Sequence, residues 1–198
     1  MIKLKDILLE STAPDIFIPR KIEDRVVRLI HLYVRNGSKG ELDLRNRNLI
    51  ELPEILKDIT VDRYFDCSHN NLISLKNSPK SVGGSFICNS NELTSLEGAP
   101  KYVSGNFICN NNHLTSLKGA PNIINGNFAC NGNELTSLAG APETVDKTFS
   151  CMYNKLTSLQ GAPKTVGGDF WCSDNPGKFT KAQVRTVCNV KGVVVVAV

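Results

Sequence analysis

The sequence lacks any long apolar run. The longest uninterrupted apolar stretch, residues 193–198, has six residues, far short of the roughly 18–20 that a helix needs to cross a bilayer. Charged side chains interrupt the first ten residues, which argues against the apolar segment of a secretory signal peptide. No membrane segment is therefore expected, and the sequence favours a soluble, cytoplasmic protein.

The sequence also lacks a strong excess of charge of one sign. Its formal net charge is +4 over 198 residues. Basic and acidic side chains number 11 and 10 in residues 1–60, and 12 and 9 in residues 61–198. The basic surface expected of a dedicated nucleic-acid-binding protein is missing, so no DNA or RNA partner is expected.

Seven cysteines are present, but no two of them form a C-x-x-C pair. Six are spaced 21 residues apart, at Cys67, Cys88, Cys109, Cys130, Cys151 and Cys172, and only Cys188 lies outside this series. Phenylalanine precedes each of the six by two residues, and asparagine follows each by three. Leucine, proline and Val or Ile recur with the same period, which gives the unit V-x-x-x-F-x-C-x-x-N-x-L-x-S-L-x-x-x-P-x-x. The pattern predicts a repeat architecture.

The repeat resembles the leucine-rich repeat, L-x-L-x-x-N-x-L, with Phe and Cys in place of the two strand leucines. Residues 42–53 form a more ordinary copy with leucines at these positions, although Arg47 stands where Asn is expected. The phrase F-x-C-x-x-N-x-L-T-S-L-x-G-A-P is similar to repeat proteins of large tailed bacteriophages. The resemblance implies an α/β solenoid: a right-handed coil with a concave parallel sheet of about seven strands and a convex side of mostly extended or 3-10 segments.

Alternation along each short strand predicts which side chains are buried. Because strand side chains point to opposite faces in turn, Phe and Cys should both point into the coil. The following Asn should turn the chain and stack into a ladder that satisfies buried backbone groups. The strands are expected to begin near residues 42, 65, 86, 107, 128, 149 and 170.

Both ends of the repeat are expected to carry caps. Residues 19–36 read as an amphipathic helix that starts at Pro19, ends before Gly37 and presents Ile22, Val26, Leu29, Ile30 and Tyr33 on one face. Thr180 to Gln183 matches a capping box, and the helix that follows should present Val184, Val187 and Cys188. Residues 193–198 should add a last edge strand. The expected domains are an N-terminal cap (1–39), the solenoid (40–178) and a C-terminal cap (179–198).

The residues that suggest chemistry have simpler explanations. The cysteine column is interpreted as small buried hydrophobes, because thiols side by side on parallel strands suit neither zinc nor disulfide geometry. Free thiols also favour a reducing compartment. His69 and His113 lie at different places in the repeat and His31 lies on the expected N-terminal helix, so they are expected to form no cluster with each other or with a repeated carboxylate. No catalytic residue, metal or cofactor is predicted.

The outward positions of the strands are the candidate partner-binding surface. Exposed Ile and Met and the single Trp are not what solubility alone selects, and contiguous exposed apolar side chains mark binding sites. The alternative is that these residues simply suit β-structure. The predicted partner-binding residues are Tyr64, Asp66, Ile87, Asn89, Asn106, Ile108, Asn110, Asn127, Asn131, Met152, Asp169 and Trp171.

The sequence predicts a non-enzymatic protein-interaction module whose concave face binds a protein partner, with a host factor as target if the phage resemblance holds. The alternative is a structural or assembly protein of a virus particle. An enzyme is disfavoured, because bacterial leucine-rich-repeat ubiquitin ligases carry their chemistry in a separate large domain, and here about 20 residues follow the last coil. A monomer or weak homo-oligomer is expected.

Overall fold

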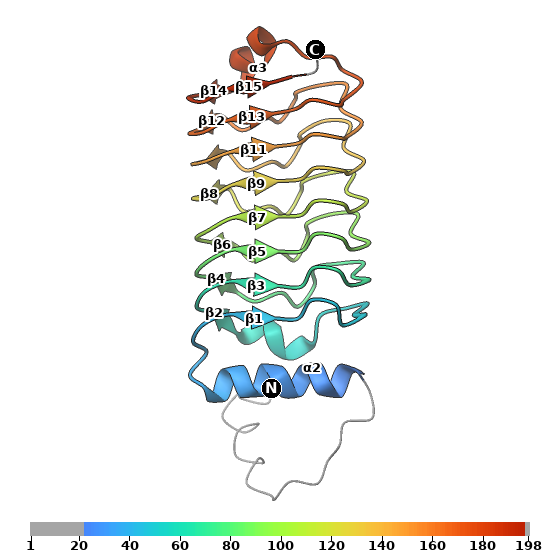
Figure 1. Ribbon diagram of the computed structural model, residues 1–198, viewed down its shortest axis with the longest axis vertical. Helices are drawn as coiled ribbons and strands as arrows, with labels where there is room; N and C mark the ends of the chain where they lie inside the picture. The colour runs from blue at the N-terminus through green and yellow to red at the C-terminus, as the bar shows by residue number, and fades with distance from the viewer. Residues whose placement is uncertain (1–21, 197–198) are drawn as a thin grey trace, which may run out of the picture.

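The computed structural model describes residues 22–196. The chain rises as a stack of coils from helix α2 to helix α3 (Figure 1). In each coil the front strand runs from left to right and the chain returns from right to left behind it as it climbs, so the coil is right-handed (Figure 1).

One strand from each coil joins a long parallel sheet of eight strands. Phe86 pairs with Phe107 and Ile87 with Ile108, so residues 21 apart lie side by side. The seven expected strands are present, and the C-terminal residues add the expected eighth. The strands are β1 (Leu42–Asp43), β3 (Phe65–Asp66), β5 (Phe86–Ile87), β7 (Phe107–Ile108), β9 (Phe128–Ala129), β11 (Phe149–Ser150), β13 (Phe170–Trp171) and β15 (Val194–Val195).

The inward side chains of this sheet form the core. The six repeat phenylalanines are fully buried, and five of the six repeat cysteines are as well. Neighbouring rings lie 5.1–5.7 Å apart between centroids, within the range of favourable aromatic pairs. Each buried phenylalanine contributes about 1.5–3 kcal/mol, and the stacking makes the core continuous from coil to coil. The predicted inward alternation is confirmed.

The repeated asparagines form a buried ladder at the end of each strand. Asn112 donates from Nδ2 to the carbonyl oxygens of Cys88 and Cys109, both at 3.1 Å, and its Oδ1 accepts the Leu93 N–H at 3.1 Å. The same contacts recur at Asn91, Asn133, Asn154 and Asn175. Each ladder asparagine therefore satisfies backbone groups in two successive coils, as the sequence predicted.

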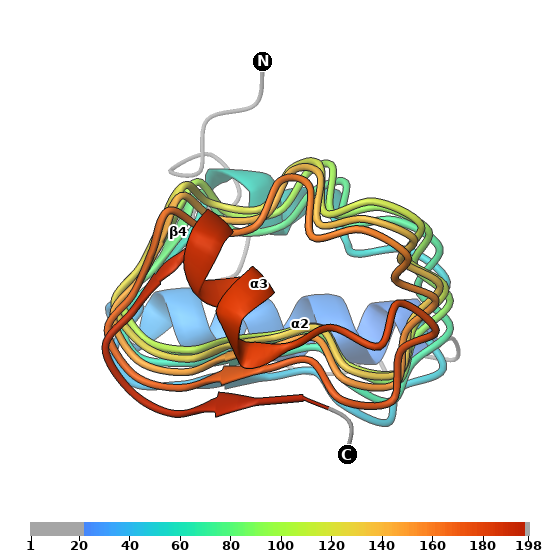
Figure 2. The same cartoon turned by 90° about the horizontal axis from the view of Figure 1, so that it is seen from above.

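The coils carry a second set of short strands, which the sequence analysis did not predict. The Val or Ile of each repeat is the buried end of such a strand. Two parallel sheets result, one of three strands and one of four. Their members are β2 (Thr60–Val61), β4 (Ser81–Val82) and β6 (Tyr102–Val103), and β8 (Ile123–Ile124), β10 (Thr144–Val145), β12 (Thr165–Val166) and β14 (Asn189–Val190). Figure 2 shows β4 on a different side of the coil from the long sheet.

The remaining side of the coil, expected to hold mostly extended or 3-10 segments, consists mostly of turns and bends. Within residues 22–196 one 3-10 helix, η2 (Glu54–Asp58), lies in the first coil. Gly119, at φ +99°, shows why the turn needs glycine: a Cβ there would lie 2.3 Å from the Leu96 carbonyl oxygen of the preceding coil. Close stacking of the coils thus depends on the absence of a side chain at this point.

Helix α2 (Ile22–Arg35) covers the first coil (Figure 1). Val26 and Ile30 are fully buried, and the Tyr33 hydroxyl donates to the Ser38 carbonyl at 2.6 Å and accepts the Asp62 N–H at 3.0 Å. The chain leaves the helix through Gly37, at φ +76°. The predicted cap is confirmed for these residues, whereas its proposed start at Pro19 lies outside the described residues.

Helix α3 (Lys181–Val187) closes the other end of the stack. Both hydrogen bonds of the predicted capping box between Thr180 and Gln183 are present. Val184 and Cys188 are buried as expected. The expectation for Val187 was wrong, because its side chain is about half exposed and faces away from the core. Strand β15 follows and pairs in parallel with β13.

Replacing a ladder asparagine should destabilise the fold strongly. In Asn112→Ala the buried Leu93 N–H loses its acceptor, whereas the Cys88 carbonyl keeps its bond from Asn91 Nδ2, so the free energy of unfolding should fall by roughly 1–3 kcal/mol. Thr115→Ala, at an exposed position of the same coil, should change it by less than about 0.5 kcal/mol. Urea unfolding measures both. Equal effects of the two substitutions would contradict the ladder.

Candidate functional site on the concave face

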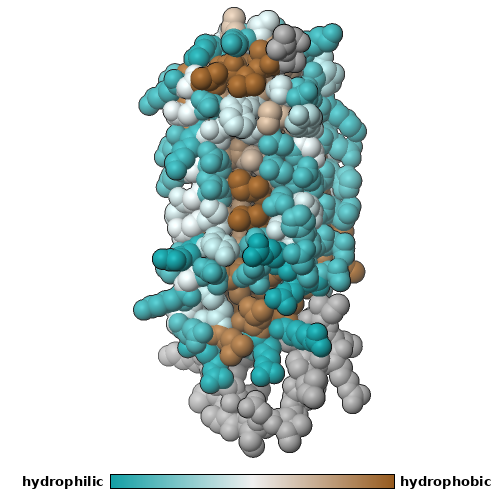
Figure 3. All heavy atoms as spheres, viewed as in Figure 1, coloured by the Kyte–Doolittle hydropathy of each residue, from teal (hydrophilic) through white to brown (hydrophobic). Residues whose placement is uncertain are grey.

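The outer face of the long sheet is hollowed along the stack. Seen from above, the middle coils lie behind the first and last coils on this side, so the face is concave (Figure 2). A narrow apolar column runs down its middle with hydrophilic side chains on both sides (Figure 3). The candidate site is this concave face.

The middle column consists of the second residue of each strand. Ile87, Ile108, Ala129 and Trp171 are partly exposed, as predicted. Ser150 is buried because its hydroxyl donates to Asn131 Oδ1 at 2.7 Å. The accessible apolar floor therefore extends over β5, β7 and β9 and reappears at Trp171.

Asp66 was expected to be an accessible residue of the site, and this expectation was wrong, because its side chain is covered although it lies on the outer face beside Ile87. The residue is only 5% exposed. Its Oδ1 accepts both the backbone N–H of Ser68 at 2.9 Å and the Ser68 hydroxyl at 2.6 Å, and Arg45 Nη1 lies 3.9 Å from Oδ2. These contacts direct the carboxylate back onto the sheet, so it offers little surface to a partner.

The predicted residues that flank the column are all partly exposed. They lie before the strand at Tyr64, Asn106, Asn127 and Asp169, and after it at Asn89, Asn110, Asn131 and Met152. Between Ser85 and Met152 none of the outward side chains is charged. At the N-terminal end, partial burial and the carboxylates of Glu41 and Asp43 raise the pKa of Tyr64. The middle of the face is therefore uncharged.

Several flanking side chains also hold the coils together, which the sequence analysis missed. Asn106 Oδ1 accepts the Asn127 N–H at 2.8 Å, and Asn127 Oδ1 accepts the Thr148 N–H at 3.0 Å. Asp169 Oδ1 accepts the Val193 N–H at 2.8 Å in the same way. The partners of the first two bonds are 21 residues apart along the chain, so the repeat itself was the signal that they touch, whereas Asp169 and Val193 are 24 residues apart.

Trp171 lies near the C-terminal end of the face, beside Val195 of the edge strand. Its indole Nε1 is buried and has no hydrogen-bond acceptor among the described residues. A buried donor without a partner costs free energy. Trp171 thus combines a partly exposed ring with an unsatisfied polar atom.

The cysteine column is not a reactive site. All seven cysteines are free and buried. Burial raises the pKa of each repeat thiol, to about 11 at Cys172, and raises that of Cys188 to about 11 as well. A thiol is nucleophilic and binds metals as the thiolate, which these raised pKa values disfavour at neutral pH.

His113 does contact carboxylates, contrary to expectation. Glu92, His113 and Glu134 occupy the same position in three successive coils. His113 Nε2 lies 2.9 Å from Glu92 Oε2, and Nδ1 lies 3.3 Å from Glu134 Oε1. Hydrogen bonds to Glu134 and Glu92 raise the pKa of the imidazole. The group is exposed, and the two ring nitrogens face different carboxylates.

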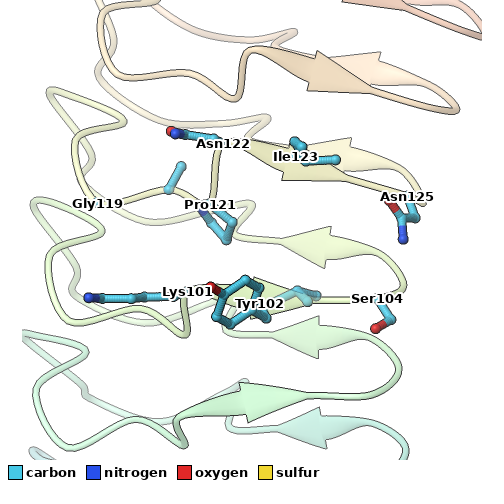
Figure 4. A pocket seen from close by; sticks show the side chains of 10 residues that line it. Lys101, Tyr102, Ser104, Gly119, Pro121, Asn122, Ile123 and Asn125 are labelled. Carbon is cyan, nitrogen blue, oxygen red and sulfur yellow. The ribbon is translucent and has the colours of Figure 1, made fainter.

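A cleft of about 510 Å³ lies outside the concave face, between the coils of β6 and β8. The three-stranded and four-stranded sheets are separated at this point. Ser104 N–H donates to the Val82 carbonyl and Asp146 N–H to the Ile124 carbonyl, but the equivalent bond from Asn125 N–H to the Val103 carbonyl is absent. Tyr102 and Ile123 flank the cleft on neighbouring coils (Figure 4) and are 74% and 61% exposed. The cleft is a second apolar surface that sequence reasoning missed.

Comparison with known proteins identifies the fold. The structure is similar to the leucine-rich-repeat domain of a Shigella effector, with a TM-score of 0.65 and 19% sequence identity, over 96% of this chain and 94% of that chain. No family model matches the sequence. No curated protein matches it either. The chain is therefore a leucine-rich-repeat-like solenoid.

Clusters suited to a metal ion and membrane-spanning helices are both absent from residues 22–196. No group of three or more His, Cys, Asp or Glu side chains there is arranged to hold a metal ion. None of the helices in that range has both the length and the apolar character needed to span a membrane.

The buried thiols should make stability fall at high pH. Unfolding exposes thiols with an ordinary pKa near 9, whereas Cys172 and Cys188 keep their protons up to about pH 11 in the fold. The unfolded state therefore loses protons first, and the free energy of unfolding should decrease as the pH rises from about 9 to about 11. Urea unfolding across this range tests it, with Cys188→Ala expected to reduce the slope. A free energy that stays constant over this range would refute it.

The Glu92–His113–Glu134 group should also contribute to the free energy of unfolding, at lower pH than the thiols do. Because the folded-state pKa of His113 is raised, its contribution is present below the unfolded value near 6.5 and is lost as pH rises through the folded value. Glu92→Gln with Glu134→Gln should lower the His113 pKa toward 6.5 in an NMR titration. An unchanged pKa in the double variant would show that the carboxylates do not act on the ring.

Proposed function

We propose that this chain is a non-enzymatic interaction module that binds a protein partner with the concave face. The observation that carries the proposal is the uncharged, hollowed surface with a central apolar column formed by Ile87, Ile108 and Ala129 and extended by Trp171. Apolar side chains gathered on one face mark interaction sites. Aromatic residues such as Trp171 are frequent anchors of such sites.

The geometry of the fold supports the same proposal. Short strands held in register present their outward side chains from a rigid scaffold, so little conformational entropy is lost when a partner binds. Repeat proteins use extended concave surfaces in this way. Tyr64, Asn89, Asn106, Asn110, Asn127, Asn131, Met152 and Asp169 then form the rim of the interface, which is polar except at Met152.

The partner we propose is a bacterial host protein. Support comes from the repeat phrase F-x-C-x-x-N-x-L-T-S-L-x-G-A-P, which is similar to that of proteins from large tailed bacteriophages. The seven free, buried thiols support a reducing compartment, since disulfides form readily in oxidising ones. The host cytoplasm is the compartment proposed.

Charging the apolar column should abolish partner capture. The triple variant Ile87→Asp, Ile108→Asp, Trp171→Asp should weaken capture from a host lysate by at least about thirtyfold, because central apolar anchors contribute about 2 kcal/mol or more each. The bound protein, identified with the unaltered chain, is quantified by mass spectrometry. Circular dichroism checks that the variant remains folded.

A matched variant controls for the added charge. Ile73→Asp, Tyr102→Asp, Ile123→Asp changes three exposed apolar residues away from the concave face and should leave capture unchanged. If the folded concave variant retains the partner, or if only the control variant loses it, the concave face is not the binding surface.

A further inference from the structure

Two asparagines on the rim before the strands have a fixed amide orientation. Asn106 and Asn127 each accept a backbone N–H of the next coil through Oδ1. A backbone N–H can only donate, so the atom facing it must be the amide oxygen rather than the nitrogen. The Nδ2 group of each side chain is therefore turned away from this bond.

The opposite rim repeats this arrangement. Asn110 Oδ1 accepts the Asn131 N–H at 2.8 Å, and Asn131 Oδ1 accepts the Met152 N–H at 2.9 Å. In the described part of the chain none of the four Nδ2 groups donates a hydrogen bond, although all four residues are partly exposed. Because each amide nitrogen carries two hydrogens, two rows of unused donors border Ile108 and Ala129.

The spacing of the rows indicates the shape of the occupant. They stand four residues apart on extended strands, about 13 Å at 3.3 Å per residue. An α-helix with its side chains is about 10–12 Å wide and fits between them. A single extended backbone is narrower than the gap between the rows, since neighbouring strands lie about 4.8 Å apart. The helical pitch of about 5.4 Å also approaches the coil spacing of about 4.8 Å.

The chemistry of the rows indicates which side chains the occupant carries. The outward positions from Ser85 to Met152 hold no charge, and the four rim amides offer donors whose acceptor oxygens are already used. A complementary partner must supply acceptors, and carboxylates accept more strongly than neutral groups. An apolar stripe of the partner would cover Ile87, Ile108 and Ala129.

We propose that the concave face binds an amphipathic α-helix that lies along the stack of coils, with an apolar stripe flanked by Asp or Glu. Its stripe residues, at i, i+4 and i+7, lie over the apolar floor. Its carboxylates accept hydrogen bonds from the Nδ2 groups of Asn106, Asn110, Asn127 and Asn131. This inference rests on the proposed function, which it narrows to one kind of partner.

One double variant reverses the hydrogen-bonding character of the two rims and keeps the bonds between coils. Asn106→Asp with Asn131→Asp preserves an oxygen for each inter-coil bond, as native Asp169 does at the position equivalent to Asn106. The outward atom changes from a donor to a charged acceptor. The two sites lie on opposite rims, which limits repulsion between the new charges. The control is Asn122→Asp with Asn125→Asp, which adds the same charge at exposed positions beside the cleft between the coils of β6 and β8.

Three synthetic peptides of about 18 residues, or five helical turns, serve as probes in fluorescence-anisotropy titrations. The first has a leucine stripe flanked by Glu, the second has Lys in place of Glu, and the third is the Glu peptide with two central prolines that prevent a helix. The Glu helix should bind the unaltered chain at least about tenfold more tightly than either other peptide. The Asn106→Asp/Asn131→Asp variant should bind the Lys helix more tightly than the Glu helix. The control variant should still bind the Glu helix more tightly.

Equal binding of the Glu and Lys helices, or of the helical and proline-containing peptides, would overturn the inference. So would failure of the Glu helix to bind while capture of the native partner still depends on Ile87, Ile108 and Trp171, a result that would leave the proposed function standing. Survival of capture in the triple aspartate variant would instead overturn the proposed function.

Discussion

The hydrogen bonds of the buried asparagine ladder are the interaction on which the rest of the structure depends. Each coil must bend after two strand residues, and the bend leaves backbone N–H and C=O groups inside the molecule, where water does not satisfy them. One amide per coil satisfies groups in its own coil and in the preceding one. The bond can form only when successive coils are in register, so the ladder both closes each turn and aligns it with the next.

This alignment creates the candidate site. Residues that are 21 positions apart become neighbours, so the isoleucines at Ile87 and Ile108 form part of an apolar column. The polar residues on either side of them form the rims in the same way. The rim asparagines bond to a neighbouring coil as the ladder asparagines do, but through only one of the two polar atoms of the amide. Their oxygens hold the coils, and their nitrogens remain available. A single repeated residue type therefore contributes to the stability of the sheet edge and to the chemistry of the proposed interface.

Most of the fold could be predicted because it follows from local patterns with a fixed period. The inward Phe and Cys, the asparagine ladder, the capping box at Thr180 and the edge strand β15 all depend on residues whose spacing is visible in the chain. The second set of short strands could not be predicted in this way. One buried Val or Ile between turn residues gives the same sequence pattern in a bend as in a two-residue strand. The burial of Asp66 depends on bonds to Ser68, and the donor rows depend on amide orientations. Such details require the distances between atoms. His113 is different, because Glu92 and Glu134 lie one repeat before and one repeat after it, so these contacts could have been predicted from the sequence.

Hydrogen exchange of the asparagine side-chain amides, followed by NMR, tests the account most directly. The Nδ2 groups of the ladder asparagines, at 70, 91, 112, 133, 154 and 175, are buried and bonded, so they should exchange only on unfolding. The Nδ2 groups of Asn106, Asn110, Asn127 and Asn131 face outward without acceptors and should exchange at rates close to those of a free side chain. Rapid exchange of the ladder, or protection of the rim groups in the unbound protein, would contradict the account.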